Sequence, residues 1–135
     1  MTSVLLRHAS AGHRLDWEHD DHLRPLDARG RRQSADLVEV LRPFGVRRLV
    51  SSPYVRCVQT VEPLAATLGL EVEQDDRLRE GAGGAAAGLL SEDGVVCCTH
   101  GDIVEALLGR GLKKGASVVI SDGEVVREIP PPKSY

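Results

Sequence analysis

Three short apolar segments of this chain each lead into an arginine or a histidine. Residues 4–6 are followed by Arg7-His8, residues 49–51 lead into Ser52-Pro53 and Arg56, and residues 95–99 lead into His100-Gly101. Each segment is typical of a buried strand. Ligands of open α/β sheets bind beyond the carboxyl ends of the strands. We therefore expect these four cationic or cationisable side chains to form one pocket for a small anion, and phosphate is the favoured ligand.

The rest of the pattern predicts an α/β domain. Apolar side chains recur at helical spacing from Asp27, the expected N-cap, to residue 43, and a second helix is expected from a Ser52 cap and Pro53 to Gly69. A third helix is expected over residues 102–108. Residues 71–75 alternate like a strand, and residues 116–120 and 124–129 flank an Asp122-Gly123 hairpin turn. Residues 9–23 are predicted to form a loop over the pocket, and residues 77–88 carry no clear pattern.

The composition is that of a single soluble domain of 135 residues, with 41% hydrophobic and 27% charged residues. A net charge of -3 argues against a general nucleic-acid binder. No apolar stretch approaches the roughly 20 residues of a membrane span, and Arg7 interrupts the N-terminal apolar run too early for a signal peptide. We therefore expect a cytoplasmic protein without membrane or nucleic-acid partners. Cys57, Cys97 and Cys98 are expected to be buried free thiols.

The residue types at the strand ends suit phosphoryl transfer. A histidine with a neutral ring nitrogen attacks phosphorus and holds the phosphoryl group covalently. Nearby cations neutralise the non-bridging oxygens, and Arg7, Arg56 and a second histidine would supply them. The helix starts after Ser52 and Gly101 would also direct their backbone amides at the anion.

The leaving group of such a reaction needs a proton from a carboxyl group near the pocket. Glu80 is the preferred source, because it lies in the glycine-flanked loop after the segment at 71–75. Glu92, Asp93 and Asp102 are alternatives nearby in the sequence.

The loop over the pocket contains five residues that bind metals in other proteins: His13, His19, Asp20, Asp21 and His22. A solvated polar loop is the preferred interpretation, because the chemistry above needs no metal and no other cofactor. Trp17 and Arg24, in or beside this loop, are candidate substrate contacts. A cysteine phosphatase is excluded, because no arginine follows six residues after Cys57 or Cys98.

Five motifs spread from residue 4 to about residue 129 resemble the histidine phosphatase superfamily, which has the phosphoglycerate-mutase-like fold. These motifs are Arg7-His8-Ala9, Arg24-Pro25-Leu26 with Gly30 and Gln33, Ser51-Ser52-Pro53-Tyr54-Val55-Arg56 with Gln59-Thr60, Leu78-Arg79-Glu80-Gly81, and Thr99-His100-Gly101. The Ser-Ser-Pro-x-x-Arg-x-x-Gln-Thr block is the most specific of them. The short length and the Arg-His-Ala sequence resemble small phosphohistidine phosphatases of the SixA type, and also the histidine phosphatase domain attached to some Nudix hydrolases.

This resemblance implies a single domain over residues 1–135, with a loose tail at 130–135, folded as a three-layer sandwich around a mostly parallel sheet. It implies that His8 is the phosphate-accepting nucleophile, that Arg7, Arg56 and His100 complete the phosphate pocket, and that Glu80 is the proton donor. The segment between Glu80 and residue 95 is too short for the lid of larger members, so an open site is expected. Such a site suits a protein-borne phosphate or a nucleotide, and protein phosphohistidine is the preferred substrate. A nucleotide or another small phosphorylated metabolite is the alternative substrate, and a non-catalytic phosphate-binding module is the alternative function.

Overall fold

A computed structural model, which describes residues 1–133, contains a six-stranded sheet in the order β3-β2-β4-β1-β5-β6. The strands are β1 (Thr2–Arg7), β2 (Arg48–Ser51), β3 (Val72–Gln74), β4 (Val95–Thr99), β5 (Ser117–Ser121) and β6 (Glu124–Ile129). The first four are parallel, and β5 and β6 join them as an antiparallel hairpin beside β1. The predicted α/β fold with a mostly parallel sheet is confirmed.

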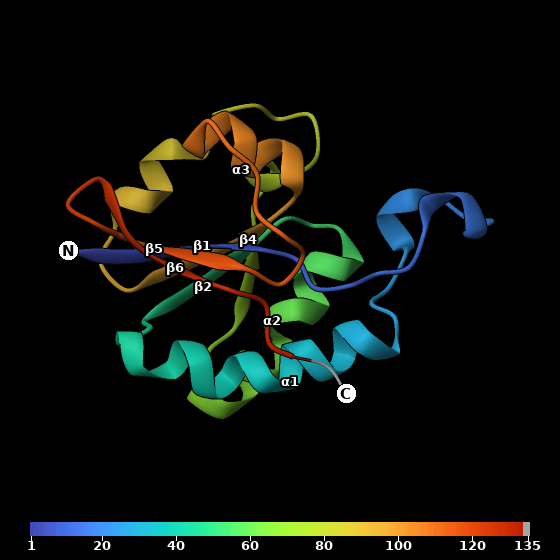
Figure 1. Ribbon diagram of the computed structural model, residues 1–135, viewed down its shortest axis with the longest axis horizontal. Helices are drawn as coiled ribbons and strands as arrows, with labels where there is room; N and C mark the ends of the chain where they lie inside the picture. The colour runs from blue at the N-terminus through green and yellow to red at the C-terminus, as the bar shows by residue number, and fades with distance from the viewer. Residues whose placement is uncertain (134–135) are drawn as a thin grey trace.

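Helices cover both faces of this sheet, which makes the molecule a three-layer sandwich (Figure 1). Helices α1 (Ala28–Leu41) and α2 (Val55–Leu68) lie on one face, and α3 (Gly101–Leu108) lies on the other. Residues 1–133 also contain five short 3₁₀ turns: η1 (Arg14–Asp16), η2 (Asp21–Leu23), η3 (Arg42–Phe44), η4 (Asp76–Leu78) and η5 (Ala87–Ser91). None of the helices within residues 1–133 is long and apolar enough to cross a membrane.

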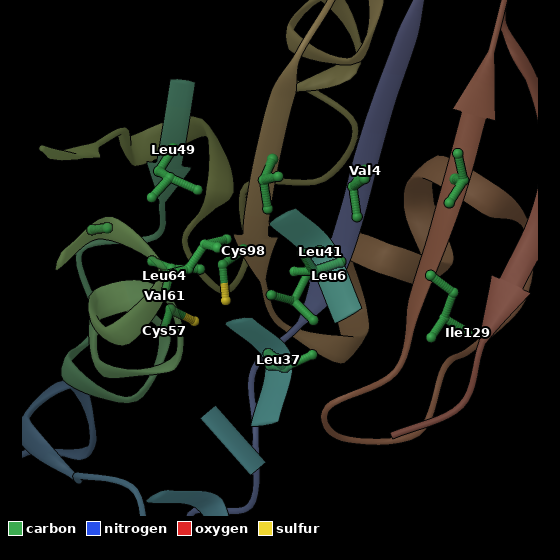
Figure 2. Packing of buried hydrophobic residues seen from close by; sticks show 13 residues of the cluster. Val4, Leu6, Leu37, Leu41, Leu49, Cys57, Val61, Leu64, Cys98 and Ile129 are labelled. Carbon is green, nitrogen blue, oxygen red and sulfur yellow. The ribbon is translucent and has the colours of Figure 1, made fainter. Parts of the chain in front are cut away.

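The alternation of side chains along the strands divides the core into two halves. Val4 and Leu6 of β1 point toward α1 and α2, where they pack with Leu37, Leu41 and the buried face of α2 (Figure 2). Leu5, between them, points to the opposite face and packs near η5 and α3. Both halves are built mainly from aliphatic side chains. Cys57 and Cys98 lie in the first half and Cys97 in the second, and all three are free thiols as predicted.

The boundaries of most elements agree with the sequence patterns. Asp27 caps α1 as predicted, because its side chain accepts a hydrogen bond of 2.7 Å from the backbone amide of Gly30. The hairpin turn places both Asp122 and Gly123 at positive φ, which the Asp-Gly pair tolerates. The predicted tail has no helix or strand over residues 130–133, and its last residues, 134–135, lie outside the described residues.

The start of α2 differs from the prediction. The helix begins at Val55 after Tyr54, and not at a Ser52 cap followed by Pro53. The hydroxyl of Ser52 accepts a hydrogen bond of 3.2 Å from the amide of Tyr54 and also binds a histidine from a distant part of the chain. The backbone of Tyr54 is extended, with ψ 137°, so the helix begins only at the next residue.

Candidate active site

The strand order brings the three predicted motifs together. β4 lies between β1 and β2, and all three strands run in the same direction, so the residues that follow them meet at one edge of the sheet. Arg7 and His8 come from the end of β1, Arg56 from the first turn of α2, and His100 and Gly101 from the start of α3. The rings of His8 and His100 are 5.5 Å apart.

One ring nitrogen of His8, Nδ1, is hydrogen-bonded to the backbone, and the other, Nε2, is not. Nδ1 lies 2.8 Å from the carbonyl oxygen of Ala9, so it donates to this acceptor and Nε2 carries the lone pair. Only 4% of the His8 surface is exposed. Burial is the main cause that lowers the pKa of His8, to about 3, and the positive charges of Arg56 and Arg7 lower it further. The ring is therefore neutral, which is the state that a nucleophilic histidine requires.

Several motif residues position the chain after His8. The backbone amide of Ala9 donates to Thr60 Oγ1 on α2, and the amide of Ser10 donates to Gln33 Oε1 on α1, each over 3.0 Å. An ideal Cβ at Gly30 would lie only 1.9 Å from the carbonyl oxygen of Ser10, so only glycine fits there. Both helices thus fix the backbone beside His8.

Buried polar nitrogens without hydrogen-bond partners gather around His8. Within residues 1–133, four buried side-chain polar atoms have no partner, and three of them are Arg7 Nε, Arg56 Nε and His100 Nδ1. Buried polar groups are nearly always paired. Three such nitrogens on residues that meet at one sheet edge indicate a site that binds an anionic oxygen-rich ligand.

The guanidinium of Arg7 lies against the start of α3. An ideal Cβ at Gly101 would be 3.0 Å from Arg7 Cζ, so glycine lets the cation approach the first turn of the helix. Arg7 Nη1 donates a hydrogen bond of 2.7 Å to the carbonyl oxygen of Leu112. Burial lowers the pKa of Arg7 from its ordinary value, although Glu105 opposes this shift.

Ser52, predicted as a phosphate contact, lies behind His100. Its hydroxyl and His100 Nε2 share a buried hydrogen bond of 2.8 Å, and the amide of Tyr54 donates to the same oxygen over 3.2 Å. The Cys57 thiol lies 3.6 Å from the same ring nitrogen. Because Nε2 is engaged on this side, Nδ1 is the His100 nitrogen that remains for a ligand.

Tyr54 belongs to the Ser-Ser-Pro motif without a predicted role, yet it contacts two of the predicted site residues. Its ring packs edge-on against His100, with 4.6 Å between centroids, and Arg56 Cζ lies 4.9 Å from its centroid. The aromatic ring therefore orients both groups. The sequence signal for this role was its place two residues before Arg56.

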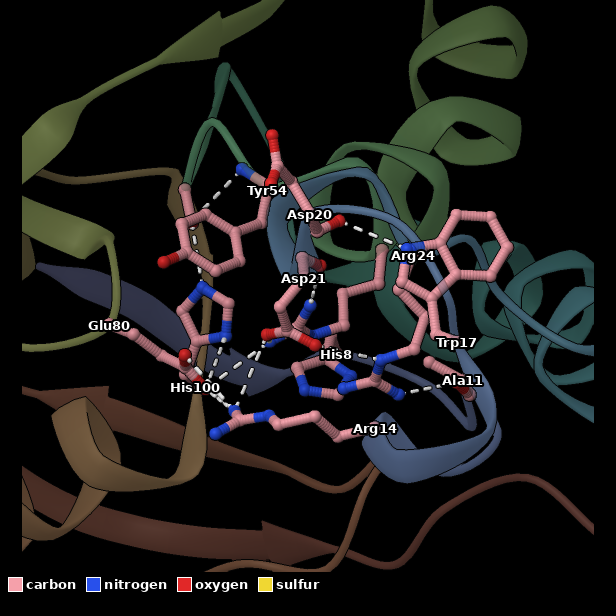
Figure 3. Close-up of polar contacts among 12 residues, drawn as sticks. His8, Ala11, Arg14, Trp17, Asp20, Asp21, Arg24, Tyr54, Glu80 and His100 are labelled. Atoms are coloured by element: carbon pink, nitrogen blue, oxygen red, sulfur yellow. Dashed lines mark hydrogen bonds and ion pairs between the residues drawn. The ribbon is translucent and has the colours of Figure 1, made fainter.

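Two carboxylates engage the cations of the site (Figure 3). Arg56 Nη2 lies 3.0 Å from Asp21 Oδ2 and 3.2 Å from Glu80 Oε1, and Glu80 Oε1 is 3.9 Å from His100 Nδ1. The exposed Arg14 contacts both carboxylates, because its Nη2 lies 3.4 Å from Asp21 Oδ2 and 2.9 Å from Glu80 Oε1. The carboxylate oxygens thus bind the donors that would otherwise face a ligand.

The structure separates the alternative carboxylates. Asp93 accepts a hydrogen bond from the amide of Thr2, at the amino end of β1, and Glu92 pairs with Arg48 at the start of β2, so both lie at the opposite end of the sheet. Asp102 lines the same cavity as Glu80 and accepts a hydrogen bond of 2.8 Å from the amide of Gly81.

The loop at residues 9–23 contains two 3₁₀ turns, η1 and η2, and places Asp21 rather than Trp17 beside the cations. Asp21 pairs with Arg24 and Arg56, and these hydrogen bonds and charges lower its pKa against the opposing effect of burial. The indole of Trp17 donates to the carbonyl oxygen of Asp20 and packs against His19, apart from the cluster around His100 (Figure 3). Residues 1–133 hold no group of three or more side chains arranged for a metal ion.

These residues surround an open cavity of about 290 Å³. Among its lining residues are six that the sequence analysis named as site candidates: Arg7, His8, Arg24, Arg56, Glu80 and Gly101. Ser52 and Trp17 are not among the lining residues, and His100 lies just beneath the surface with 1% exposure. Lys114, which the sequence analysis did not single out, lines the cavity from the loop between α3 and β5.

Comparison with known proteins agrees with this geometry. The model of the histidine phosphatase superfamily (branch 1) matches residues 3–94. The chain belongs to this superfamily. The superfamily resemblance found in the motifs is therefore confirmed.

Two kinds of relatives stand out. An 8-oxo-(d)GTP phosphatase from Mycolicibacterium smegmatis is 36% identical over 148 residues, which cover 93% of this chain and 46% of that protein, so the chain spans about half of its length. A protein histidine phosphatase SixA bound to tungstate has a TM-score of 0.80 at 22% identity, over 97% of both chains. A SixA structure from Agrobacterium tumefaciens has a TM-score of 0.79 at 20% identity, over 96% of this chain and 97% of that one. The two structures establish the likeness in fold.

Proposed function

We propose that this chain hydrolyses a phosphoryl group through a covalent phosphohistidine on His8. One observation carries the proposal. A buried histidine, neutral because its pKa is lowered to about 3, lies beside three unpartnered buried nitrogens of Arg7, Arg56 and His100. The nucleophile and two of these donors, Arg7 and Arg56, line one open cavity, and the buried His100 lies with its ring 5.5 Å from that of His8.

In the first step, the lone pair of His8 Nε2 attacks phosphorus while the bond from phosphorus to the leaving atom breaks. The leaving atom is an imidazole nitrogen in phosphohistidine and an oxygen in a phosphate ester or anhydride, and it keeps the bonding electrons. Arg7, Arg56 and His100 bind the non-bridging oxygens, at about 1.5–3 kcal/mol for each hydrogen bond to a charged group. The incoming phosphate displaces Glu80 and Asp21 from Arg56. Glu80, once released from Arg56, takes up a proton from solvent and donates it to the leaving atom.

In the second step, water attacks the phosphohistidine. The same carboxylate, now deprotonated, accepts a proton from this water, and the P–N bond breaks with its electrons returning to Nε2. Inorganic phosphate leaves, and His8 is again neutral. The hydrogen bond from Nδ1 to the carbonyl oxygen of Ala9 holds the ring in one orientation through both steps.

Two substrate classes fit this cavity. Protein-borne phosphohistidine is supported by the open site, which a side chain on a protein surface can enter, and by the likeness in fold to SixA. The terminal phosphate of a nucleotide is supported by the relative from M. smegmatis, whose name states an 8-oxo-(d)GTP phosphatase activity.

The test is phosphate release by the wild-type chain, His8→Ala and the matched control His19→Ala, with EDTA present. The panel contains a phosphohistidine protein, nucleoside di- and triphosphates, a sugar phosphate and an aryl phosphate. We expect turnover by the wild type and the control, and a loss of at least about 10³-fold in His8→Ala. Turnover that survives in His8→Ala would refute the proposed nucleophile.

A further inference from the structure

A second and larger recess adjoins the catalytic cavity and shares Gly12, His13 and Lys114 with it. Its volume is about 540 Å³, within the range of small-molecule sites. The other lining residues are Ser10, Asp27, Arg29, Gln33, Lys113 and Pro131. A ligand with one group at His8 therefore has room for a further group in this recess.

The recess is positively charged, although the chain as a whole has a net charge of -3. Arg29, Lys113 and Lys114 line it, against the single carboxylate of Asp27. Asp27 accepts hydrogen bonds from the backbone amides of Gly30 and Gly12 and from the hydroxyl of Ser10. Asp27 thus fixes the start of α1, and its one negative charge stands against the three cations that line the recess.

The backbone that carries the two lysines is fixed directly behind the nucleophile. The amide of Gly115 lies 3.1 Å from the carbonyl oxygen of Arg7 and 2.9 Å from that of His8, and it donates to both. Gly115 has φ +84°, and an ideal Cβ there would lie 3.2 Å from Pro131 Cβ, so the loop is closely packed. Cations held in this way bind an anion without first paying for the ordering of a flexible loop.

Within residues 1–133, the side-chain ammonium groups of Lys113 and Lys114 make no hydrogen bond and no ion pair, although the backbone carbonyl of Lys113 accepts a hydrogen bond from the amide of Ala116. Lys114 is also crowded by like charges. Burial, and then the charges of Arg7, Arg24 and Arg56, lower its pKa, and only Asp27 opposes this. A bound anion that reaches both cavities would relieve this repulsion.

We propose that the recess binds the second phosphate of a substrate whose terminal phosphate lies against His8, so that the substrate is a small-molecule phosphoanhydride such as a nucleoside diphosphate. This inference rests on the proposed phosphatase function and selects between its two substrate classes. A phosphohistidine side chain carries one phosphate only and leaves the recess empty.

The recess also assists the chemistry of such a substrate. When the bond between His8 Nε2 and the terminal phosphorus forms, the bond from that phosphorus to the bridging oxygen breaks. The bridging oxygen keeps the electron pair and departs on the second phosphate, whose added negative charge Lys113 and Lys114 offset. Departure therefore depends less on a proton from Glu80 than it does for an alcohol leaving group.

Binding tests the recess without any turnover. Methylenediphosphonate and methylphosphonate, which are not hydrolysed, are titrated calorimetrically into the wild type, into Lys113→Gln/Lys114→Gln, and into the matched control Lys133→Gln. We expect the diphosphonate to bind the wild type and the control at least about tenfold more tightly than the monophosphonate, and the double variant to lose this preference. A preference that persists in the double variant, or is absent in the wild type, would overturn the inference.

Kinetics on the same proteins separates this inference from the function on which it rests. We expect kcat/KM of the double variant to fall at least about tenfold more for a nucleoside diphosphate than for an aryl phosphate. Equal losses on both substrates would contradict a second-phosphate site and leave the phosphatase proposal standing. If the wild type hydrolyses neither substrate, the phosphatase proposal fails, and the phosphonate titrations alone decide whether the recess binds a second phosphate.

Discussion

Replacement of Ser52 by alanine tests whether the geometry of His100 matters for catalysis. The Ser52 hydroxyl is the partner of His100 Nε2, at 2.8 Å in a fully buried setting. His100 Nδ1 has no partner within residues 1–133, so the variant would leave both ring nitrogens without a side-chain oxygen to bond. The ring would then lose the contact that directs Nδ1 toward the cavity.

The size of the effect follows from this single contact. An unsatisfied buried polar group costs about 1–3 kcal/mol. If this energy orients His100 in the transition state, it corresponds to a roughly 5- to 150-fold fall in kcat/KM. The free energy of unfolding should fall by a similar about 1–3 kcal/mol.

Ser51→Ala is the matched control, because Ser51 is equally buried. Its hydroxyl donates a hydrogen bond of 2.8 Å to the carbonyl oxygen of Ser52 and does not contact His100. Steady-state kinetics and denaturant unfolding are measured on both variants. We expect both to lose stability and only Ser52→Ala to lose activity. Equal activity losses in the two variants, or full activity in Ser52→Ala, would refute the positioning role of Ser52.

Three further predictions follow from the site. Glu80→Gln should slow substrates with poor leaving groups at least about tenfold more than an aryl phosphate, since only the former need its proton; equal loss would exclude it as the acid. The pKa of His8 is lowered to about 3, so the ring stays neutral as the pH falls through 6.5. The value of kcat/KM, corrected for substrate ionisation, should therefore not decline near pH 6.5, and a decline there would mean that His8 titrates at its ordinary pKa. Gly30→Ala should lower the free energy of unfolding by about 2 kcal/mol or more and reduce activity, because the added Cβ would collide with the carbonyl oxygen of Ser10. The control Gly84→Ala, which has open space around its Cβ, should change neither the stability measured by calorimetry nor the kinetics.

The sequence predicted the parts of this molecule that depend on local patterns. The apolar segments before Arg7, Ser52 and His100 are strands of one parallel set, and their common direction brings the motif residues together. Asp27 caps its helix because the contact that satisfies it, the amide of Gly30, lies three residues away. In the first case the arrangement follows from the topology of parallel strands, and in the second the interaction joins residues that are close in sequence.

The remaining features depend on contacts between distant residues. The Ser52 hydroxyl binds His100, 48 residues away, which no local pattern predicts, and the extended backbone of Tyr54 moves the start of α2 to Val55. Asp21 lies in an irregular loop, where nothing in the sequence separates it from Asp20, yet it binds Arg56 across 35 residues. Lys114 reaches the cavity only because the next residue, Gly115, is bonded to the end of β1.

Direct detection of phosphate on His8 tests the central claim most sharply. The chain is mixed with a ³²P-labelled substrate and quenched in alkali, in which phosphohistidine persists, and the labelled peptide is identified by mass spectrometry. We expect a burst of label on the peptide that contains His8, released by acid and absent from His8→Ala. Turnover without label on His8, or label that remains in His8→Ala, would contradict a reaction through this histidine.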